Sequence, residues 1–264
     1  MATFQSGGLS LAYDDRPPMG AAAGTILLVH GFAMSRAESW KRLGWYAAFE
    51  RKGWRTIALD LRGHGESDKP HEAAAYARAD MIGDLATLLD HLGLGRVDVL
   101  GYSMGAHLAL GLTLAHPGRV DRLILGGVGG RVLDGGGPIA KAGMTLAEAM
   151  RADDPETIAE PTLRGFRKFA ELQGDDRMAL AACSQGAGRP VTAEDFAAVR
   201  APTLVVAGAL DEIAGDPGRL ADALPDAKTV SLPACDHFSA IPHALFKAAV
   251  FDFLEGWLEE EPFP

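Results

Sequence analysis

Short apolar runs alternate with helical patterns along most of this chain. The runs are rich in leucine and β-branched residues and occupy positions 25–30, 56–60, 97–101, 122–127, 203–208 and 228–232. Most are continuously apolar, which is typical of parallel strands that are buried on both faces. Between them, the stretch 81–93 places its apolar residues on one helical stripe and ends at Gly93. This alternation predicts an α/β fold with a doubly wound, mostly parallel sheet.

The two ends of the chain add to this sheet. Gly7 and Gly8 separate two short strand-like pieces, which predicts an antiparallel hairpin at the sheet edge and brings the total to eight strands. The stretch 242–258 predicts a helix that begins near Pro242 and packs Leu245, Val250, Phe253 and Leu254 inward.

One interval, 131–199, interrupts the alternation. It shows helical pieces at 140–152, 162–174 and 176–188 but no strand pattern, and a Gly-rich loop at 126–138 leads into it. About 70 residues are too many for a plain loop. We therefore expect residues 1–130 and 200–264 to form the core and 131–199 to form an inserted helical cap over the sheet end. The alternative is a set of extra helices on a sheet face.

Composition excludes several classes of partner. The net charge is -10 and lysine and arginine do not cluster, which argues against nucleic acid and anionic membranes. Cys183 and Cys235 match neither a disulfide framework nor a zinc site, so no metal or organic cofactor is expected. The N-terminus does not resemble a signal peptide, and no apolar run reaches the ~20 residues of a membrane helix. These features predict a cytoplasmic monomer or homodimer that acts on a small molecule.

The segment "VDVLGYSMGAH" (97–107) carries a candidate nucleophile. Gly-x-Ser-x-Gly alone is a weak motif, but here an apolar strand precedes it and a helical pattern follows it. Such a sharp turn lifts the hydroxyl of Ser103 clear of the sheet and needs small residues at Gly101 and Gly105. The alternative is an ordinary turn serine.

A serine hydroxyl needs a base, and the base needs an orienting carboxylate. Asp211 follows the run 203–208 and His237 follows the run 228–232, in the order serine, acid, histidine. Both positions lie where the loops of a parallel sheet gather at its carboxyl edge. These spacings predict Ser103, Asp211 and His237 as catalytic residues.

The expected oxyanion hole draws on two backbone N–H groups. Met104 directly follows the nucleophile, and Phe32 lies in the loop after the run 25–30. The ring of Phe32 would also form a wall of the substrate pocket. Phe166 and Phe169 in the expected cap are further pocket candidates, although they could instead form the cap's own core. Arg164, Arg167 and Lys168 could meet an acidic substrate, although such a cluster is usually a solvated helix face.

Five segments together resemble the α/β-hydrolase superfamily, in its form with a short helical cap. They are "LLVHGFAMS", "IALDLRGHGESDKP", "LGYSMGAHLAL", "VVAGALDEIAG" and "CDHFSAIPH", and the resemblance covers residues 4–130 and 200–258. It implies the α/β-hydrolase fold, a nucleophile, acid and base at Ser103, Asp211 and His237, and oxyanion donors at Phe32 and Met104. The loop from Asp60 to Gly65 resembles a structural loop at the pocket edge.

One position departs from the family pattern. Many members carry glycine just before the histidine, whereas this chain has Asp236, a second carboxylate beside the base. Adjacent side chains of an extended loop point in opposite directions, so we expect Asp211 to be the acid.

The predicted activity is hydrolysis of a small or medium carboxylic ester through an acyl-enzyme. Cleavage of a C–C bond, or cofactor-free perhydrolysis, would use the same three residues. Dehalogenases and epoxide hydrolases of this fold need a carboxylate nucleophile, which Ser103 argues against. A non-catalytic small-molecule receptor could retain all three residues.

Overall fold

The computed structural model describes residues 2–134 and 143–258 and contains an eight-stranded sheet. Its strand order is β1-β2-β4-β3-β5-β6-β7-β8. The pairs β1–β2 and β2–β4 are antiparallel, and all the others are parallel. The predicted mostly parallel sheet is confirmed. The strands are β1 (Ala2–Ser6), β2 (Leu9–Arg16), β3 (Gly24–Val29), β4 (Trp54–Leu59), β5 (Val97–Tyr102), β6 (Val120–Gly126), β7 (Thr203–Gly208) and β8 (Ala227–Leu232).

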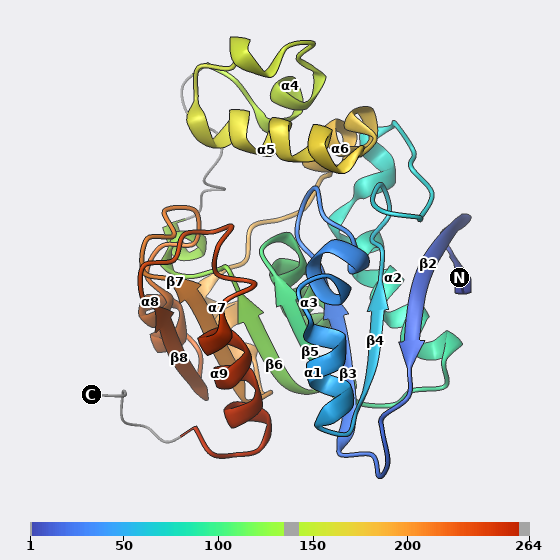
Figure 1. Ribbon diagram of the computed structural model, residues 1–264, viewed down its shortest axis with the longest axis vertical. Coiled ribbons are helices and arrows are strands. Elements are labelled where there is room, and N and C mark those ends of the chain that lie inside the picture. The colour runs from blue at the N-terminus through green and yellow to red at the C-terminus, as the bar shows by residue number, and fades with distance from the viewer. Residues whose placement is uncertain (1, 135–142, 259–264) are drawn as a thin grey trace.

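Helices cover both faces of this sheet (Figure 1). The α-helices are α1 (Trp45–Arg51), α2 (Arg78–His91), α3 (Met104–Ala115), α4 (Leu146–Arg151), α5 (Pro161–Gln173), α6 (Arg177–Ser184), α7 (Ala193–Ala198), α8 (Pro217–Asp222) and α9 (Ala244–Leu254). Shorter helical turns are η1 (Ala37–Lys41), η2 (Ala73–Tyr76), η3 (Pro117–Arg119), η4 (Gly130–Asp134) and η5 (Pro155–Thr157).

The continuous apolar runs follow from this double cover. In β3, Ile26 and Leu28 pack into the cluster that α1 and α9 complete, whereas Leu27 and Val29 pack into the cluster on the α2, α3 and α8 side. Because successive side chains of a strand point to opposite faces, a strand buried on both faces must be apolar at every position.

The strand order places a reversal at β3. The chain runs from β3 outward to β4 and then returns to β5 on the other side of β3. Loops that leave the carboxyl ends of neighbouring strands diverge at such a point and open a crevice, where α/β proteins bind ligands. The loops after β3 and β5 carry Phe32 and Ser103, so these two residues lie at this reversal.

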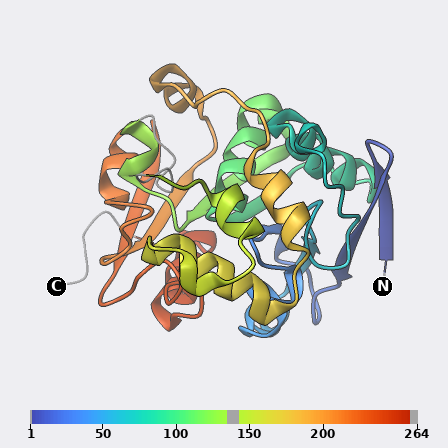
Figure 2. The same cartoon turned by 90° about the horizontal axis from the view of Figure 1, so that it is seen from above.

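The helices α4, α5 and α6 lie above the carboxyl ends of the strands, away from both sheet faces (Figures 1 and 2). Ala149, Ile158 and Leu163 form a small apolar cluster of their own. Phe166 and Ala170 of α5 instead join the main core cluster. The first residues of the predicted helix 140–152 and the last of the loop 126–138 lie outside the described residues.

One detail of the predicted C-terminal helix is wrong. Its helical turns begin at Ala244, with His243 as the N-cap, whose side chain accepts a hydrogen bond from the N–H of Leu245 at 3.2 Å. This start turns Leu245 outward, where it is 50% exposed, and turns Phe246 into the core. Within residues 2–134 and 143–258, no helix combines the length and the apolar character needed to cross a bilayer.

Candidate active site

Ser103 lies at a sharp turn between β5 and α3. Its backbone has φ 53° and ψ -115°, a conformation that costs about 1–3 kcal/mol in a non-glycine residue. The two flanking glycines make this turn possible. A Cβ on Gly101 would lie 2.3 Å from the carbonyl oxygen of Gly105, and one on Gly105 would lie 2.1 Å from that of Val29. The motif spacing therefore follows from steric contact between the strand, the turn and the helix.

The loop that carries His237 is fastened to β5 and to the loop after β7. The hydroxyl of Tyr102 donates a hydrogen bond to the carbonyl of His237, and the two rings lie 5.6 Å apart. The N–H of Leu210 donates to the carbonyl of Cys235 at 2.8 Å. Gly208 permits this approach, because a Cβ there would lie 2.2 Å from the same oxygen. The loops after β5, β7 and β8 are thus held against one another.

These contacts bring Ser103, His237 and Asp211 into one hydrogen-bonded chain. Ser103 Oγ lies 2.9 Å from His237 Nε2, and His237 Nδ1 lies 2.8 Å from Asp211 Oδ2. A carboxylate can only accept, so Nδ1 carries the proton and Nε2 is left to accept from the serine hydroxyl. Asp211 Oδ1 accepts from the N–H groups of Ile213 and Ala214 at 3.0 and 2.8 Å, which fixes the carboxylate. The Asp211 side chain is fully buried.

Asp236 does not contact the imidazole. Its Oδ1 accepts hydrogen bonds from the N–H of Phe238 at 3.1 Å and from the N–H and hydroxyl of Ser239 at 2.8 and 2.6 Å. These hydrogen bonds, above all that from the Ser239 hydroxyl, lower the pKa of Asp236. The second carboxylate is therefore occupied in shaping the loop.

The two expected oxyanion donors come from the start of α3 and from the loop after β3. Met104 is the first residue of α3, and its N–H is one of the amides that a helix start leaves unpaired. Within the described part of the chain, neither this N–H nor that of Phe32 has a backbone acceptor. Both amides are available for a ligand, and their role with an oxyanion stays a prediction.

Two neutral histidines support the loop that carries Phe32. His30 Nε2 accepts from the N–H of Leu61 at 3.0 Å, and the His64 ring lies edge-on to that of Phe32 at 5.9 Å. Burial lowers the pKa of His30 to about 4 and that of His64 to about 3. Both rings are uncharged at neutral pH, and His30 links the loops after β3 and β4.

The loop after β4 is tied to the same region through Asp60. This carboxylate accepts from the N–H groups of Arg36 and Glu66, each at 2.8 Å, and also pairs with the Arg36 guanidinium. A Cβ on Gly65 would lie 2.2 Å from Asp60 Oδ2. These contacts are structural, and none of them reaches Ser103.

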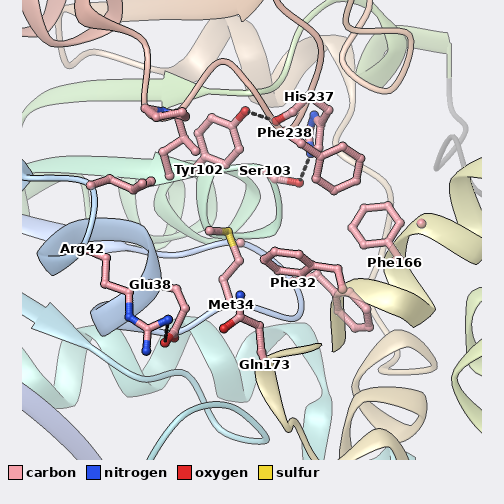
Figure 3. A pocket seen from close by; sticks show the side chains of 16 residues that line it. Phe32, Met34, Glu38, Arg42, Tyr102, Ser103, Phe166, Gln173, His237 and Phe238 are labelled. Carbon is pink, nitrogen blue, oxygen red and sulfur yellow. Dashed lines mark hydrogen bonds and ion pairs between the residues drawn. The ribbon is translucent and has the colours of Figure 1, made fainter. Parts of the chain in front are cut away.

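Ser103 and His237 open into a cavity of about 420 Å³ beneath α5 (Figure 3). Its walls are mainly apolar and come from the loops after β3, β5 and β8 and from α5. The rings of Phe32 and Phe166 lie 5.9 Å apart, and Phe238 lies 5.3 Å from Phe166 and 6.4 Å from Phe169. The lining residues are Gly31, Phe32, Met34, Glu38, Arg42, Leu43, Tyr102, Ser103, Gly165, Phe166, Phe169, Gln173, His237, Phe238, Ile241 and Pro242.

The cationic side chains of α5 do not line this cavity. Arg167 is 1% exposed and donates to the carbonyl of Ala152 at 3.1 Å. Arg164 and Lys168 both pair with Glu156. The cationic cluster therefore stabilises the inserted helices and leaves the cavity without its charge.

Sequence reasoning missed several residues of the site. Tyr102 and Phe238 directly neighbour the predicted nucleophile and base, and that adjacency was the available signal. Glu38, Arg42 and Gln173 line the cavity from η1 and from the end of α5. Nothing in the sequence marks these three, because their shared position depends on how α5 lies over the loop after β3.

Comparison with known proteins places this chain in a family. Residues 24–147 match the family model of the alpha/beta hydrolase fold. A Bacillus subtilis protein named as a putative 2-succinyl-6-hydroxy-2,4-cyclohexadiene-1-carboxylate synthase is 35% identical to this chain. That alignment covers 46% of this chain and only 41% of the relative. A 2-hydroxy-6-oxononadienedioate/2-hydroxy-6-oxononatrienedioate hydrolase of Cupriavidus pinatubonensis is 30% identical over 89% of this chain and 88% of its own.

A solved structure extends the likeness to the whole fold. A hydrolase from Pseudomonas aeruginosa is 27% identical, with a TM-score of 0.77 over 96% of this chain and 97% of its own. With a matching family model and a relative aligned along most of both chains, this chain belongs to the alpha/beta hydrolase fold family and is a hydrolase.

Proposed function

We propose that the protein is a serine hydrolase that cleaves an uncharged carboxylic ester of small or medium size through an acyl-enzyme. The observation that carries this proposal is the hydrogen-bonded chain from Asp211 through His237 to Ser103, which ends in an apolar cavity. A nucleophile, a base and an orienting acid in this geometry are the parts that acyl transfer needs.

The proposed first half-reaction makes the acyl-enzyme. Ser103 Oγ attacks the ester carbonyl carbon while His237 Nε2 takes the hydroxyl proton. The resulting imidazolium is stabilised by the carboxylate of Asp211. His237 then gives that proton to the leaving alkoxide oxygen as the C–O bond breaks, so an alcohol departs and the acyl group remains on Ser103.

The second half-reaction releases the acid. Water takes the place of the alcohol, and His237 Nε2 accepts its proton as the water oxygen attacks the acyl carbon. The bond to Ser103 Oγ breaks, and the proton returns to the serine. These steps use no metal ion and no organic cofactor.

Each tetrahedral intermediate places a negative charge on the former carbonyl oxygen. We assign the N–H groups of Phe32 and Met104 to this charge, helped by the positive N-terminal end of α3. Loss of one such donor typically costs about 2.7–4 kcal/mol in the barrier. Donors already free and fixed in the resting enzyme need no reorganisation during the reaction.

We further propose that residues 131–199 act as a cap on the core formed by 1–130 and 200–264. In support of this division, α5 lies above the carboxyl ends of the strands (Figure 1), and Phe166 and Phe169 of this helix line the cavity. A cap in this place would exclude bulk water from the acyl-enzyme and set the shape of the acceptable substrate. Phe166 and Phe169 are the residues through which it would do so.

A second candidate is hydrolysis of a C–C bond in a β-diketone-like acid, which the Cupriavidus relative's name suggests. The dienedioate of that name carries two carboxylates. Among the described residues that line the cavity, the one lysine or arginine is Arg42, whose guanidinium lies 3.6 Å from the Glu38 carboxylate. A dianion would enter an apolar site without matching positive charge, so an uncharged ester is the better fit.

The test is to assay the purified protein on p-nitrophenyl esters and on the dienedioate of the relative. We expect ester turnover, labelling of Ser103 by a fluorophosphonate, and at least 10³-fold loss of kcat in Ser103→Ala with folding intact. Faster turnover of the dienedioate would favour the C–C reaction. Labelling of another residue would contradict the assigned nucleophile.

A further inference from the structure

The cavity has a polar end that the proposed reaction does not use. Glu38, Arg42 and Gln173 line the side opposite the Ser103–His237 pair, with Met34 and Phe32 between them (Figure 3). Glu38 and Arg42 come from η1 and its C-cap, and Gln173 is the last residue of α5. The two sides of this polar end therefore belong to the core and to the inserted helices.

The polar atoms at this end have unused hydrogen-bonding capacity. The Arg42 guanidinium lies 3.6 Å from the Glu38 carboxylate, which is too long for a hydrogen bond. Within residues 2–134 and 143–258, the side chains of Glu38, Arg42 and Gln173 form no hydrogen bond. The Glu38 side chain is 18% exposed and the Arg42 side chain 68% exposed, so the carboxylate is largely withdrawn from water while the guanidinium remains hydrated.

The backbone beneath this polar end is unusual as well. The N–H of Arg42 donates to the carbonyl of Ala37 at 2.9 Å, five residues back, so η1 is a π-helical turn. Such turns are rare and are frequent at functional sites. Here the turn and its C-cap carry Glu38 and Arg42, two of the three polar side chains at this end of the cavity.

The charges at this end disfavour an anionic ligand. Arg42 is balanced by Glu38, and the neighbouring Asp175 adds a second carboxylate. Burial, followed by the charge of Glu38, raises the pKa of Asp175 to about 6, although Lys69 acts in the opposite direction. Asp175 is still ionised at neutral pH, so Glu38 and Asp175 together offset Arg42 and Lys69, and a substrate carboxylate would meet no surplus of positive charge.

We infer that the polar end binds a hydroxyl group at the far end of the substrate, so that the substrate class is a hydroxyl-bearing ester. The hydroxyl would donate to Glu38 and accept from Arg42 or Gln173, which matches its one donor and two acceptor sites. Met34 and Phe32 would contact the apolar chain between the hydroxyl and the ester. This inference rests on the proposed ester hydrolysis.

The experiment compares three p-nitrophenyl ester series of equal chain length, terminated by methyl, hydroxyl or carboxylate. A hydrogen bond to a charged group in a partly exposed site is worth about tenfold. At the best chain length we therefore expect kcat/KM for the hydroxyl ester to exceed that for the methyl ester by about tenfold, with the carboxylate ester lowest. A methyl ester that is equal or better, or a preferred carboxylate, would overturn the inference.

Substitutions test which side chains cause the preference for the hydroxyl ester over the methyl ester. Gln173→Leu and Glu38→Leu should bring the hydroxyl-to-methyl ratio close to one. The matched control is Gln185→Leu at the exposed C-cap of α6, outside the cavity lining, and it should leave the ratio unchanged. A ratio that persists in both Gln173→Leu and Glu38→Leu would assign the preference elsewhere and refute the role of these side chains.

A binding measurement separates this inference from the proposed function. Calorimetry with Ser103→Ala, which cannot form the acyl-enzyme, should show about tenfold tighter binding of the hydroxyl ester than of the methyl ester. If the wild-type protein hydrolyses none of the esters, the proposed function fails. The ratio of the two binding affinities alone then tests whether the polar end binds a hydroxyl group. Equal binding of the two esters would count against the polar end even if both are hydrolysed.

Discussion

Replacement of Asp211 by asparagine should disable the base without disturbing the fold. Asn Oδ1 can still accept the N–H groups of Ile213 and Ala214, so the loop keeps its shape. The second carboxylate oxygen, 2.8 Å from His237 Nδ1, becomes an NH₂ group. Two donors would then face each other, and the imidazole would move its proton to Nε2. In that tautomer it cannot accept the proton of Ser103.

The magnitude follows from the loss of the correct tautomer. In a serine protease, the same aspartate-to-asparagine change leaves the geometry intact and lowers kcat about 10⁴-fold. The Asp211 carboxylate is fully buried, so bulk water cannot take its place beside Nδ1. We therefore expect a loss of between about 10² and 10⁴ in kcat, equivalent to about 3–5 kcal/mol in the barrier.

The matched control is Asp236→Asn. All three hydrogen bonds to its carboxylate end on Oδ1, and an asparagine oxygen can accept each of them. This variant should lose less than tenfold. Both variants are assayed side by side on one ester, with circular dichroism to check folding. A severe loss of kcat in Asp236→Asn, or an equally mild loss in both variants, would refute the assignment of Asp211 as the acid.

Four further changes test other contacts. Tyr102→Phe should lower kcat about tenfold with little change in KM, because its hydroxyl holds the carbonyl of His237; an altered KM alone would contradict a positioning role. Gly105→Ala should prevent folding, since its Cβ would lie 2.1 Å from a β3 carbonyl oxygen, and a soluble, cooperatively melting variant would contradict this. Phe169→Ala should shift the preferred acyl length in an ester series, and a change in melting temperature alone would make it a packing residue. Burial lowers the pKa of His64 from 6.5 in the unfolded chain to about 3 in the folded protein, so protonation favours unfolding as the pH falls below 6.5. In urea titrations at pH 7 and pH 5, His64→Gln should therefore lose less stability on acidification than the wild type.

The order of the elements could be read from the sequence because it depends on local patterns. A strand buried on both faces needs an apolar residue at each position, and β5 and β7 are buried throughout. The turn at Ser103 needs glycine at both flanks, because the strand and helix backbones approach within contact distance there. Ser103, Asp211 and His237 could be proposed for the same reason, since each follows a strand that the pattern identifies.

Other features depended on contacts between distant segments. The sequence offered two carboxylates near the base, and only the packing of the loop after β7 against the loop after β8 showed that Asp211 contacts the imidazole and Asp236 does not. The inward direction of Phe246 rather than Leu245 depended on where the His243 cap starts α9. The polar end of the cavity joins Glu38 and Gln173, which are 135 positions apart, and no local pattern encodes such a pair. The sequence by itself determined the sheet, the strained turn and the order of the reactive groups through short-range sterics and periodicity, while the partner of each polar group was decided by long-range packing, which only the tertiary structure contains.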